Sequence, residues 1–218
     1  MKNFRWEGLL LATFLFYTSI AMAQSLSSNQ DSLSYAAGVN IGETLKKQGL
    51  KDVDIQILQK ALTESLKGGK LLIDNQAAEK MINTYSTEQK MKEGRDFLAD
   101  NKKKTGVVAL PSGLQYEIMR KGAGGPNPKP TDKVKTHYHG MLTNGTVFDS
   151  SVDRGQPISF GLNQVIKGWT EGLQLMSVGD KYKFFIPFEL AYGDRGAGNV
   201  IPPYATLIFE VELLGINE

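Results

Sequence analysis

The stretch Val165-Ile166-Lys167-Gly168-Trp169-Thr170-Glu171-Gly172-Leu173 decides how the second half of this chain is interpreted. It predicts a short helix, because Leu173 and Met176 follow Trp169 at helical offsets and place the indole on the apolar face. The same half of the chain contains Tyr138, Phe148, Phe160, Phe184, Tyr192 and Phe209. An ordinary core tryptophan under a sheet is the simpler interpretation. However, this much aromatic surface can build a concave apolar site with polar groups at its edge.

The residues on both sides of this stretch alternate between apolar and polar, which predicts strands. One strand sends Val134, Thr136 and Tyr138 to the same face, and the Asn144-Gly145 pair after it predicts a hairpin turn. The last strand sends inward Leu207, Phe209, Val211 and Leu213. The strand before it alternates in the same way except at Phe185. We therefore predict an α+β domain in which an antiparallel sheet curls over the short helix.

The first part of the chain predicts helices instead of strands. Asp31 and Asp54 are placed to cap two short helices, which end near Gly49 and at Gly68-Gly69. Each helix has a thin apolar stripe. Because two such helices bury little surface by themselves, we expect this part of the chain to need a partner surface.

A third and longer helix is predicted from Asp74 to about Lys104, with only Gly94 interrupting the pattern. Its second half is mostly charged, with Phe97 and Leu98 as exceptions. A solvated strut that separates two domains and a plain surface helix are equally compatible with this pattern.

The beginning of the chain has the pattern of a secretion signal. Lys2 and Arg5 precede an apolar run, and Ala21-Met22-Ala23 forms a small-x-small cleavage site before Gln24. We expect an exported protein, with a retained N-terminal anchor as the alternative. The predicted organisation is a signal peptide in residues 1–23, a helical domain with the long connecting helix in 24–105, and a second domain in 106–218.

Composition and motifs argue against several classes of function. The formal net charge of +2 does not favour a nucleic-acid partner, and the absence of cysteine excludes disulfide and thiol chemistry. The glycine-rich residues 193–198 lack the Lys-Ser/Thr ending of a nucleotide-binding loop, and no Gly-x-Ser-x-Gly motif is present. His137 and His139 share one face of a strand without an evident third ligand, so we expect solvated histidines and not a metal site. We predict no metal and no cofactor.

After these exclusions, the remaining candidate is an apolar site with one carboxylate, Asp149, at its edge. Asp149 can alternatively serve only as the ion-pair partner of Arg154. Prolyl isomerisation is a reaction that needs no acid–base pair, thiol or metal. Its barrier of about 18–20 kcal/mol comes from the loss of amide resonance. A twisted amide has lost charge separation, so a dehydrated apolar cavity favours it over the planar ground state.

The same half of the chain also resembles a known family through many motifs. They are Gly145-Thr146-Val147-Phe148-Asp149-Ser150-Ser151, Val165-Ile166-Lys167-Gly168-Trp169, Met176-Ser177-Val178-Gly179-Asp180, Ile186-Pro187, Ala191-Tyr192-Gly193 and Ile201-Pro202-Pro203-Tyr204-Ala205-Thr206-Leu207-Ile208-Phe209. From about residue 112 to 216 the chain resembles the FKBP-type peptidyl-prolyl cis-trans isomerases. The resemblance implies an antiparallel half-barrel wrapped around the short helix, and an isomerase that acts without a cofactor.

The resemblance also implies roles for individual residues. Trp169 would form the floor of a proline pocket, the Ile166 N–H and the Tyr192 hydroxyl would hold substrate carbonyls, and Asp149 would face the twisting amide. The implied catalytic residues are Asp149, Tyr192, Trp169 and Phe148, and the implied substrate-binding residues are Tyr138, Ile158, Val165, Ile166, Ile201 and Phe209. The family's macrolide ligands, tacrolimus and rapamycin, would compete there. The chain departs from some members at Ile158, Ala197 and Gly198, which bears on macrolide affinity and on the residue preferred before proline.

The helical half more loosely resembles the dimerisation domain of secreted Mip-like and FkpA-like members. This resemblance implies a homodimer formed through residues 31–90 and a location in the bacterial periplasm or at the outer membrane. The resulting hypothesis is a prolyl isomerase that assists the folding of exported, proline-containing polypeptides. The alternative hypothesis is a holdase chaperone that binds proline-containing segments with little turnover.

Overall fold

The architecture of the chain is described by a computed structural model for residues 26–218; the predicted signal segment in residues 1–23 lies outside this range. The helices are α1 (Asn29–Lys47), α2 (Ile55–Leu66), α3 (Asn75–Asn101), α4 (Lys167–Leu173) and the 3-10 turns η1 (Leu162–Gln164) and η2 (Phe188–Leu190). The strands are β1 (Val107–Ala109), β2 (Gln115–Arg120), β3 (Lys133–Leu142), β4 (Val147–Ser150), β5 (Ile158–Gly161), β6 (Lys181–Ile186) and β7 (Leu207–Ile216). Contacts between Cα atoms divide the chain into a unit ending at Thr44 and a unit from Leu45 to Glu218.

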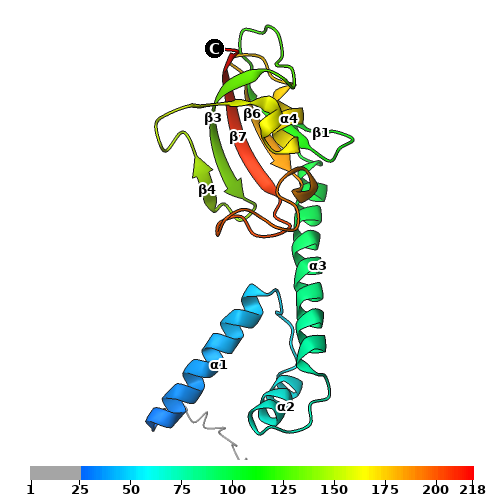
Figure 1. The fold of residues 1–218 in the computed structure, drawn as a ribbon, viewed down its shortest axis with the longest axis vertical. Coiled ribbons are helices and arrows are strands. Elements are labelled where there is room, and N and C mark those ends of the chain that lie inside the picture. Colours follow the sequence, from blue (N-terminus) through cyan, green and yellow to red (C-terminus); the bar gives the residue numbers. More distant parts are fainter. Residues whose placement is uncertain (1–25) are drawn as a thin grey trace, which may run out of the picture. The chain divides into compact units, whose positions relative to one another are not determined.

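The seven strands form one antiparallel sheet in the second unit. Their order is β1-β2-β6-β7-β3-β4, and β5 pairs with β3 beside this path. The longest ladder joins β3 to β7 and aligns Tyr138 with Val211. Figure 1 shows the strands curling around α4, so the predicted α+β fold is confirmed.

Two glycines allow α4 to lie directly on the sheet. A Cβ atom at Gly168 would lie 2.5 Å from Ile186 Cγ2, and one at Gly172 would lie 2.6 Å from Phe184 Cε1. Both distances are far below van der Waals contact, so only glycine fits at either position. Trp169 and Leu173, on the same short helix, are 5% and 0% exposed. The Gly-Trp-Thr-Glu-Gly spacing therefore seats the indole deep in the core.

The alternation predicted for β3 and β7 is confirmed, and the exception at Phe185 has a structural cause. Val134, Thr136 and Tyr138 are buried on β3. Phe185 points away from this core, yet it is only 5% exposed, because Phe97 of α3 covers it with a ring-centroid distance of 6.1 Å. Phe97, an apolar exception in the charged half of α3, and Phe185, an exception to the alternation of β6, therefore contact each other.

The C-terminal end of α3 is attached to the sheet by polar contacts as well. The Asn101 side-chain amide donates to Gln115 Oε1 at 3.0 Å, and the Gln115 amide donates to the Leu98 carbonyl at 2.9 Å. Asn101 and Gly94 are buried. The expectation of a solvated second half is therefore wrong for the last turns of α3, which run onto the sheet in Figure 1.

The predicted cap of α2 and the predicted start of α3 at Asp74 are confirmed, and the predicted cap of α1 is wrong. The Asp54 carboxylate accepts from the Gln56 and Ile57 N–H groups, and Asp74 accepts from the Ala77 N–H. In α1 the cap is Ser28, whose hydroxyl accepts from the Asp31 N–H while Asp31 accepts from the Ser28 N–H. Serine and aspartate three residues apart form a reciprocal capping box, so the helix begins earlier than an Asp31 cap predicts.

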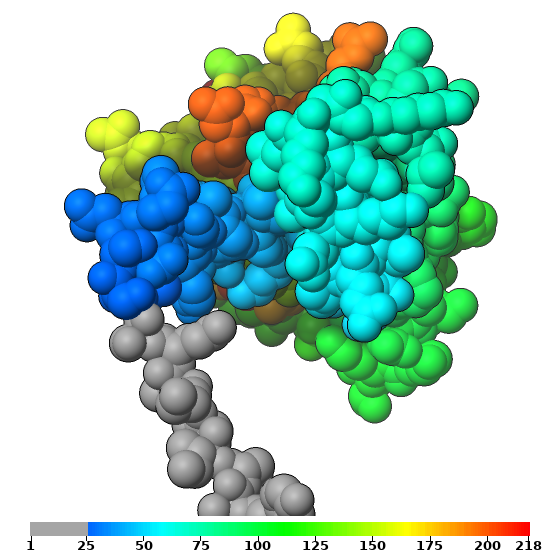
Figure 2. Space-filling model, turned by 90° about the horizontal axis from the view of Figure 1, so that it is seen from below, coloured from blue at the N-terminus to red at the C-terminus, as the bar shows by residue number. Residues whose placement is uncertain are grey.

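Large apolar side chains remain exposed on the helices of both units. On α1 they are Leu33, Tyr35 and Val39, and on α2 and the first turns of α3 they are Ile55, Ile57, Leu62, Leu66, Met81 and Tyr85. Figure 2 shows α2 and the chain that follows it in full view on the outside of the second unit. None of the helices within residues 26–218 contains a stretch long and apolar enough to cross a membrane.

The buried carboxylate of Asp180 ties the turn before β6 to the chain after β2. It accepts from the Ser177 N–H at 2.9 Å and the Gly122 N–H at 2.8 Å, and Lys121 lies 3.3 Å away. Burial disfavours its charge, but the two backbone N–H groups and Lys121 outweigh burial and lower the pKa of Asp180.

We expect Asp180→Ala to lower the free energy of unfolding by about 2–3 kcal/mol at pH 7, because two backbone donors lose their acceptor. Since the pKa is lowered in the folded state, this contribution is present above the unfolded value of about 3.9 and is lost as the pH falls through the folded pKa. Urea unfolding of the variant and the wild type between about pH 7 and pH 2.5 measures the difference. A difference that stays constant or grows toward low pH contradicts the assignment.

Candidate active site

A cavity of about 590 Å³ opens on the concave side of the sheet, above α4. All ten residues predicted for the site line it: Tyr138, Phe148, Asp149, Ile158, Val165, Ile166, Trp169, Tyr192, Ile201 and Phe209. They come from β3, β4, β5, β7, α4, the turn before α4 and the loop between η2 and β7. The fold thus gathers into one cavity residues that lie up to 71 positions apart between Tyr138 and Phe209.

The floor of the cavity is the indole of Trp169, held in place by aromatic rings. Its centroid lies 5.1 Å from the ring of Phe209 and 5.3 Å from that of Tyr138, both edge to face. Phe160 contacts it at 5.4 Å. Edge-to-face geometry is the favoured arrangement for aromatic pairs, so the rings fix one another's positions. The indole is 5% exposed, so the bottom of the cavity is an apolar surface largely shielded from solvent.

Gly140 on β3 makes room for the aromatic wall. A Cβ atom there would lie 2.7 Å from the rings of both Phe148 and Phe209. These two rings meet edge to face at 5.4 Å. A glycine in the strand therefore lets two side chains from the neighbouring strands lie over its backbone.

Asp149 is held at the lip by two polar neighbours. The Tyr138 hydroxyl donates to one of its oxygens, and the Arg154 guanidinium donates to the other. Arg154 also donates to the Tyr138 hydroxyl at 2.9 Å. The ion pair with Arg154 that was left as an alternative role for Asp149 is thus present, and the same carboxylate also lines the cavity.

These contacts change the pKa values around the lip. Burial opposes the charge of Asp149, but the hydrogen bonds from Tyr138 and Arg154 outweigh burial and lower the pKa of the carboxyl group. Burial and the hydrogen bond to Asp149 raise the pKa of Tyr138. Burial and the charge of Asp149 also raise the pKa of Tyr192. At neutral pH the site therefore holds one carboxylate and two protonated tyrosine hydroxyls.

Comparisons with known proteins identify the family of the chain. A family described as "FKBP-type peptidyl-prolyl cis-trans isomerase" matches residues 124–214, and one described as "Domain amino terminal to FKBP-type peptidyl-prolyl isomerase" matches residues 30–118. The isomerase FkpA of Aeromonas hydrophila is 44% identical over 88% of this chain and 78% of its own length. The chain belongs to the FKBP-type peptidyl-prolyl cis-trans isomerases.

Two further comparisons extend over both halves of this FKBP-type isomerase. The outer membrane protein MIP of Legionella longbeachae is 36% identical over 97% of this chain and 94% of its own length. The crystal structure of FkpA from Escherichia coli covers 88% of this chain and 99% of its own, with 31% identity and a TM-score of 0.56. The predicted family, fold and enzyme class are confirmed, and these matches do not favour the holdase alternative.

Some residues of the isomerase's cavity were missed or only partly anticipated from the sequence. Phe160 was noted as an aromatic residue of this half, and Ala197 and Gly198 were noted as departures, but none was assigned to the site. Gln164 and Val200 also line the cavity. Both are exposed: Gln164 ends the short 3-10 turn η1, and Val200 lies in the loop between η2 and β7, so neither segment is long enough for a periodicity to indicate which way a side chain points.

The two histidines of this isomerase lie on the outer face of β3 and contact serine hydroxyls. His137 Nδ1 is 3.0 Å from Ser151 Oγ, and His139 Nδ1 is 2.9 Å from Ser150 Oγ. They are partly buried, so their surroundings are hydrogen-bonding neighbours as well as solvent.

Proposed function

We propose that this isomerase places the proline ring of an X-Pro segment on the indole of Trp169 and rotates the preceding amide within the cavity. In this arrangement the Ile166 N–H and the Tyr192 hydroxyl hold substrate carbonyls, while Asp149 faces the amide. The observation that carries the proposal is an apolar cavity in which Asp149, the one carboxylate among the lining residues of the described range 26–218, is already ionised and paired with Arg154. Such a carboxylate is unsuited to proton transfer at neutral pH, but its fixed charge can orient an amide.

The geometry favours rotation over hydrolysis. A planar X-Pro amide has separated charge that water stabilises, and a twisted amide has lost it. A cavity floored by Trp169 and walled by Phe148 and Phe209 therefore favours the twisted state relative to the planar one. Each 1.4 kcal/mol or so of this preference gives about a tenfold gain in rate.

The backbone of Ile166 is available for the proposed contact. Within residues 26–218 the structure shows no hydrogen bond from the Ile166 N–H, which lies just before the first turn of α4. The Tyr192 side chain is 40% exposed at the rim, and no hydrogen bond of its hydroxyl is found in the same range. Two donors in one cavity suit the two carbonyls that flank a bound proline.

The direct test is the rate of cis/trans exchange in an X-Pro peptide with and without the protein. Uncatalysed exchange takes tens to hundreds of seconds at 25 °C, so catalysis is readily separated from background. We also propose that tacrolimus and rapamycin bind this cavity, and each should suppress the catalysed rate. A folded protein that leaves exchange at the uncatalysed rate contradicts the proposal, and the holdase alternative then becomes the better hypothesis.

We propose further that the protein is exported to the periplasm or associates with the outer membrane, where it assists the folding of exported proteins. The signal-like pattern of residues 1–23 and the similarity to the outer membrane protein MIP support this location. Cell fractionation with antibody detection tests it, and a protein found only in the cytoplasm would contradict it.

Dimerisation through residues 31–90 is also a proposal, supported by the exposed apolar side chains of α1, α2 and α3. Leu33, Tyr35 and Val39 of α1 are 65%, 65% and 50% exposed, and a group of exposed apolar side chains on one helix marks an interaction surface. We expect the chain to have twice the monomer mass in light scattering, and Leu33→Glu to shift it toward the monomer. Asn40→Glu, which adds the same charge at an exposed polar position of α1, is the matched control. A monomeric wild type would end the proposal.

A further inference from the structure

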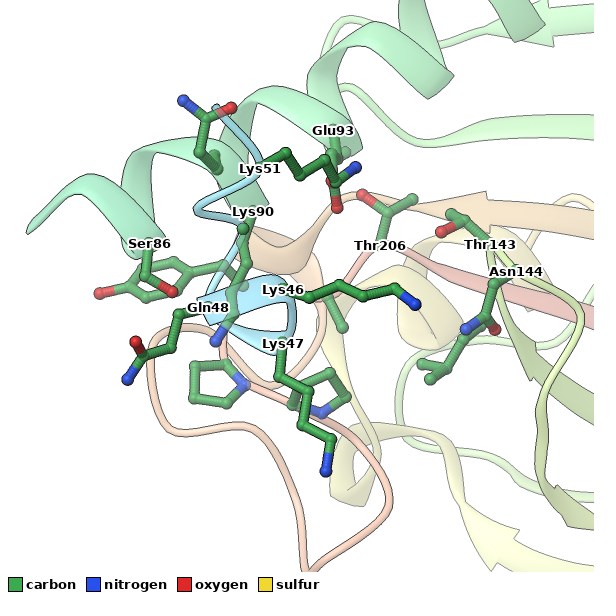
Figure 3. Close-up of a pocket in the computed structure, with 18 residues that line it drawn as sticks. Lys46, Lys47, Gln48, Lys51, Ser86, Lys90, Glu93, Thr143, Asn144 and Thr206 are labelled. Carbon is green, nitrogen blue, oxygen red and sulfur yellow. The ribbon is translucent and has the colours of Figure 1, made fainter. Parts of the chain in front are cut away.

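A glycine in the interior of α3 lies against the loop that contributes Tyr192 and Ile201 to the active-site cavity. A Cβ atom at Gly94 would lie 2.6 Å from Thr206 Oγ1, 3.7 Å from Thr206 Cβ and 4.0 Å from the Tyr204 carbonyl oxygen. In Figure 3 Thr206 lies beside α3, next to Glu93. Glycine is among the poorest residues in a helix interior, so its presence here requires a reason. The reason is that Thr206 occupies the space of its side chain.

Thr206 ends the loop whose other end supplies Tyr192 to the cavity. The loop is closed at its base, because the Tyr204 N–H donates to the Gly193 carbonyl at 2.9 Å. Thr206 is 4% exposed and stands two positions from Tyr204, while Gly193 directly follows Tyr192. A displacement of Thr206 would therefore move Tyr204 and, through its hydrogen bond to Gly193, would also move Tyr192 at the rim of the cavity.

The far end of the same loop is also rigid. Ala197 and Ile201 exchange two backbone hydrogen bonds, at 2.9 and 3.1 Å. Ile201 is 6% exposed and lines the cavity together with Ala197. These two hydrogen bonds hold the far end of the loop together, so we take its position to be set where it is attached at Gly193 and Thr206.

Strain at Tyr204 shows that the attachment is imposed by the surroundings. Its φ angle of +63° lies in the left-handed region, which a bulky residue seldom adopts. Its ring packs edge to face on Phe188, with centroids 5.4 Å apart. A backbone held in this conformation persists only where neighbouring elements fix it. Here the neighbours are η2, through Phe188, and α3, through Gly94.

We propose that α3 is a positioning element of the active site, and that the contact between Gly94 and Thr206 sets how tightly the loop of residues 192–206 holds the peptide. This inference rests on the proposed contacts of Tyr192 and Ile201 with substrate. Because those contacts are made to the bound peptide before and during rotation, a displaced loop raises KM and leaves kcat nearly unchanged. In this way α3 contributes to substrate affinity through its contact with Thr206.

The test adds a methyl group at position 94, on one side of this contact, and removes one at position 206, on the other side. Gly94→Ala pushes Thr206 outward, Thr206→Ala leaves a gap, and the double variant places the new methyl in that gap at about the 3.7 Å spacing available. We expect Gly94→Ala to raise KM about fivefold, Thr206→Ala to raise it less, and the double variant to return close to the wild-type KM. Asp96→Ala, an exposed neighbour on α3, is the control and should leave KM unchanged.

The outcomes separate this inference from the proposed function. A wild-type protein without isomerase activity overturns the proposed function itself. An active wild type whose KM is unaffected by Gly94→Ala, or whose KM increase persists in the double variant, overturns the positioning role. If Gly94→Ala does not fold, the KM of Thr206→Ala is compared with that of the double variant. The second substitution can restore the wild-type KM only if residues 94 and 206 are in direct contact.

Discussion

Trp169→Ala is expected to lower kcat/KM for X-Pro exchange by about a hundredfold, because a proline ring bound on the indole, as we propose, would lose an apolar contact worth about 2–3 kcal/mol. The truncation leaves the rings of Tyr138, Phe160 and Phe209 facing an enlarged space that water can enter. Water at the floor stabilises the planar amide and removes the preference for the twisted one. We also expect a loss of about 3–5 kcal/mol in the free energy of unfolding, as for other large core truncations.

The loss of stability must be separated from the loss of catalysis. Leu213→Ala truncates another fully buried residue, on β7 and outside the lining of the cavity. It should cost about 2–5 kcal/mol of stability while leaving kcat/KM per folded molecule unchanged. Denaturant unfolding gives the folded fraction, and peptide exchange is measured at a temperature where both variants are folded. Equal activity losses in the two variants would show that Trp169 serves only the core.

Asp149→Ala is expected to lower kcat/KM about tenfold to thirtyfold while the protein remains folded. The substitution removes the charge that we propose faces the amide, and both the Arg154 guanidinium and the Tyr138 hydroxyl lose their hydrogen bond to the carboxylate. Asp153→Ala is the matched control, because that carboxylate lies nearby, is 65% exposed and does not line the cavity. If the two variants behave alike, the role of Asp149 is confined to its ion pair.

The pH profile follows from the lowered pKa of Asp149. Since the folded pKa lies below the ordinary value of about 3.8, the carboxylate is fully ionised throughout the neutral and mildly acidic range. Activity should therefore be level from about pH 8 down to pH 5 and should fall only as the pH drops through the folded pKa. The effect of Asp149→Ala should be the same at pH 5 and pH 8. An activity change centred near pH 6 or 7 would implicate a different group.

Local sequence patterns predicted the site residues correctly where strand alternation or helical periodicity fixes the direction of a side chain. Tyr138 and Phe209 belong to alternating strands, and Trp169 belongs to a short helix, so each direction could be derived. The grouping of these residues with Ile158, Tyr192 and Ile201 depended on the family resemblance, because no period links residues in separate loops.

Contacts between distant elements could not be predicted from patterns in the same way. The sequence marked Phe97, Phe185 and Gly94 as exceptions, but nothing local states that the first two meet or that Thr206 lies against the third. Asp31 has the right chemistry for a cap, yet Ser28 three positions earlier completes a capping box and begins the helix. Local chemistry identified unusual positions, and the tertiary structure supplied their partners.

Trp169 is the one tryptophan outside the predicted signal segment, which has a practical consequence. The chain has two tryptophans, and the other, Trp6, falls within the predicted signal segment. Tryptophan emission from a chain cleaved after residue 23 would therefore originate at the bottom of a single cavity. A ring that settles on the indole displaces nearby solvent and alters that emission, so occupancy can be titrated without any label or coupled assay. The protein carries its own optical probe at the place where its substrate is proposed to bind.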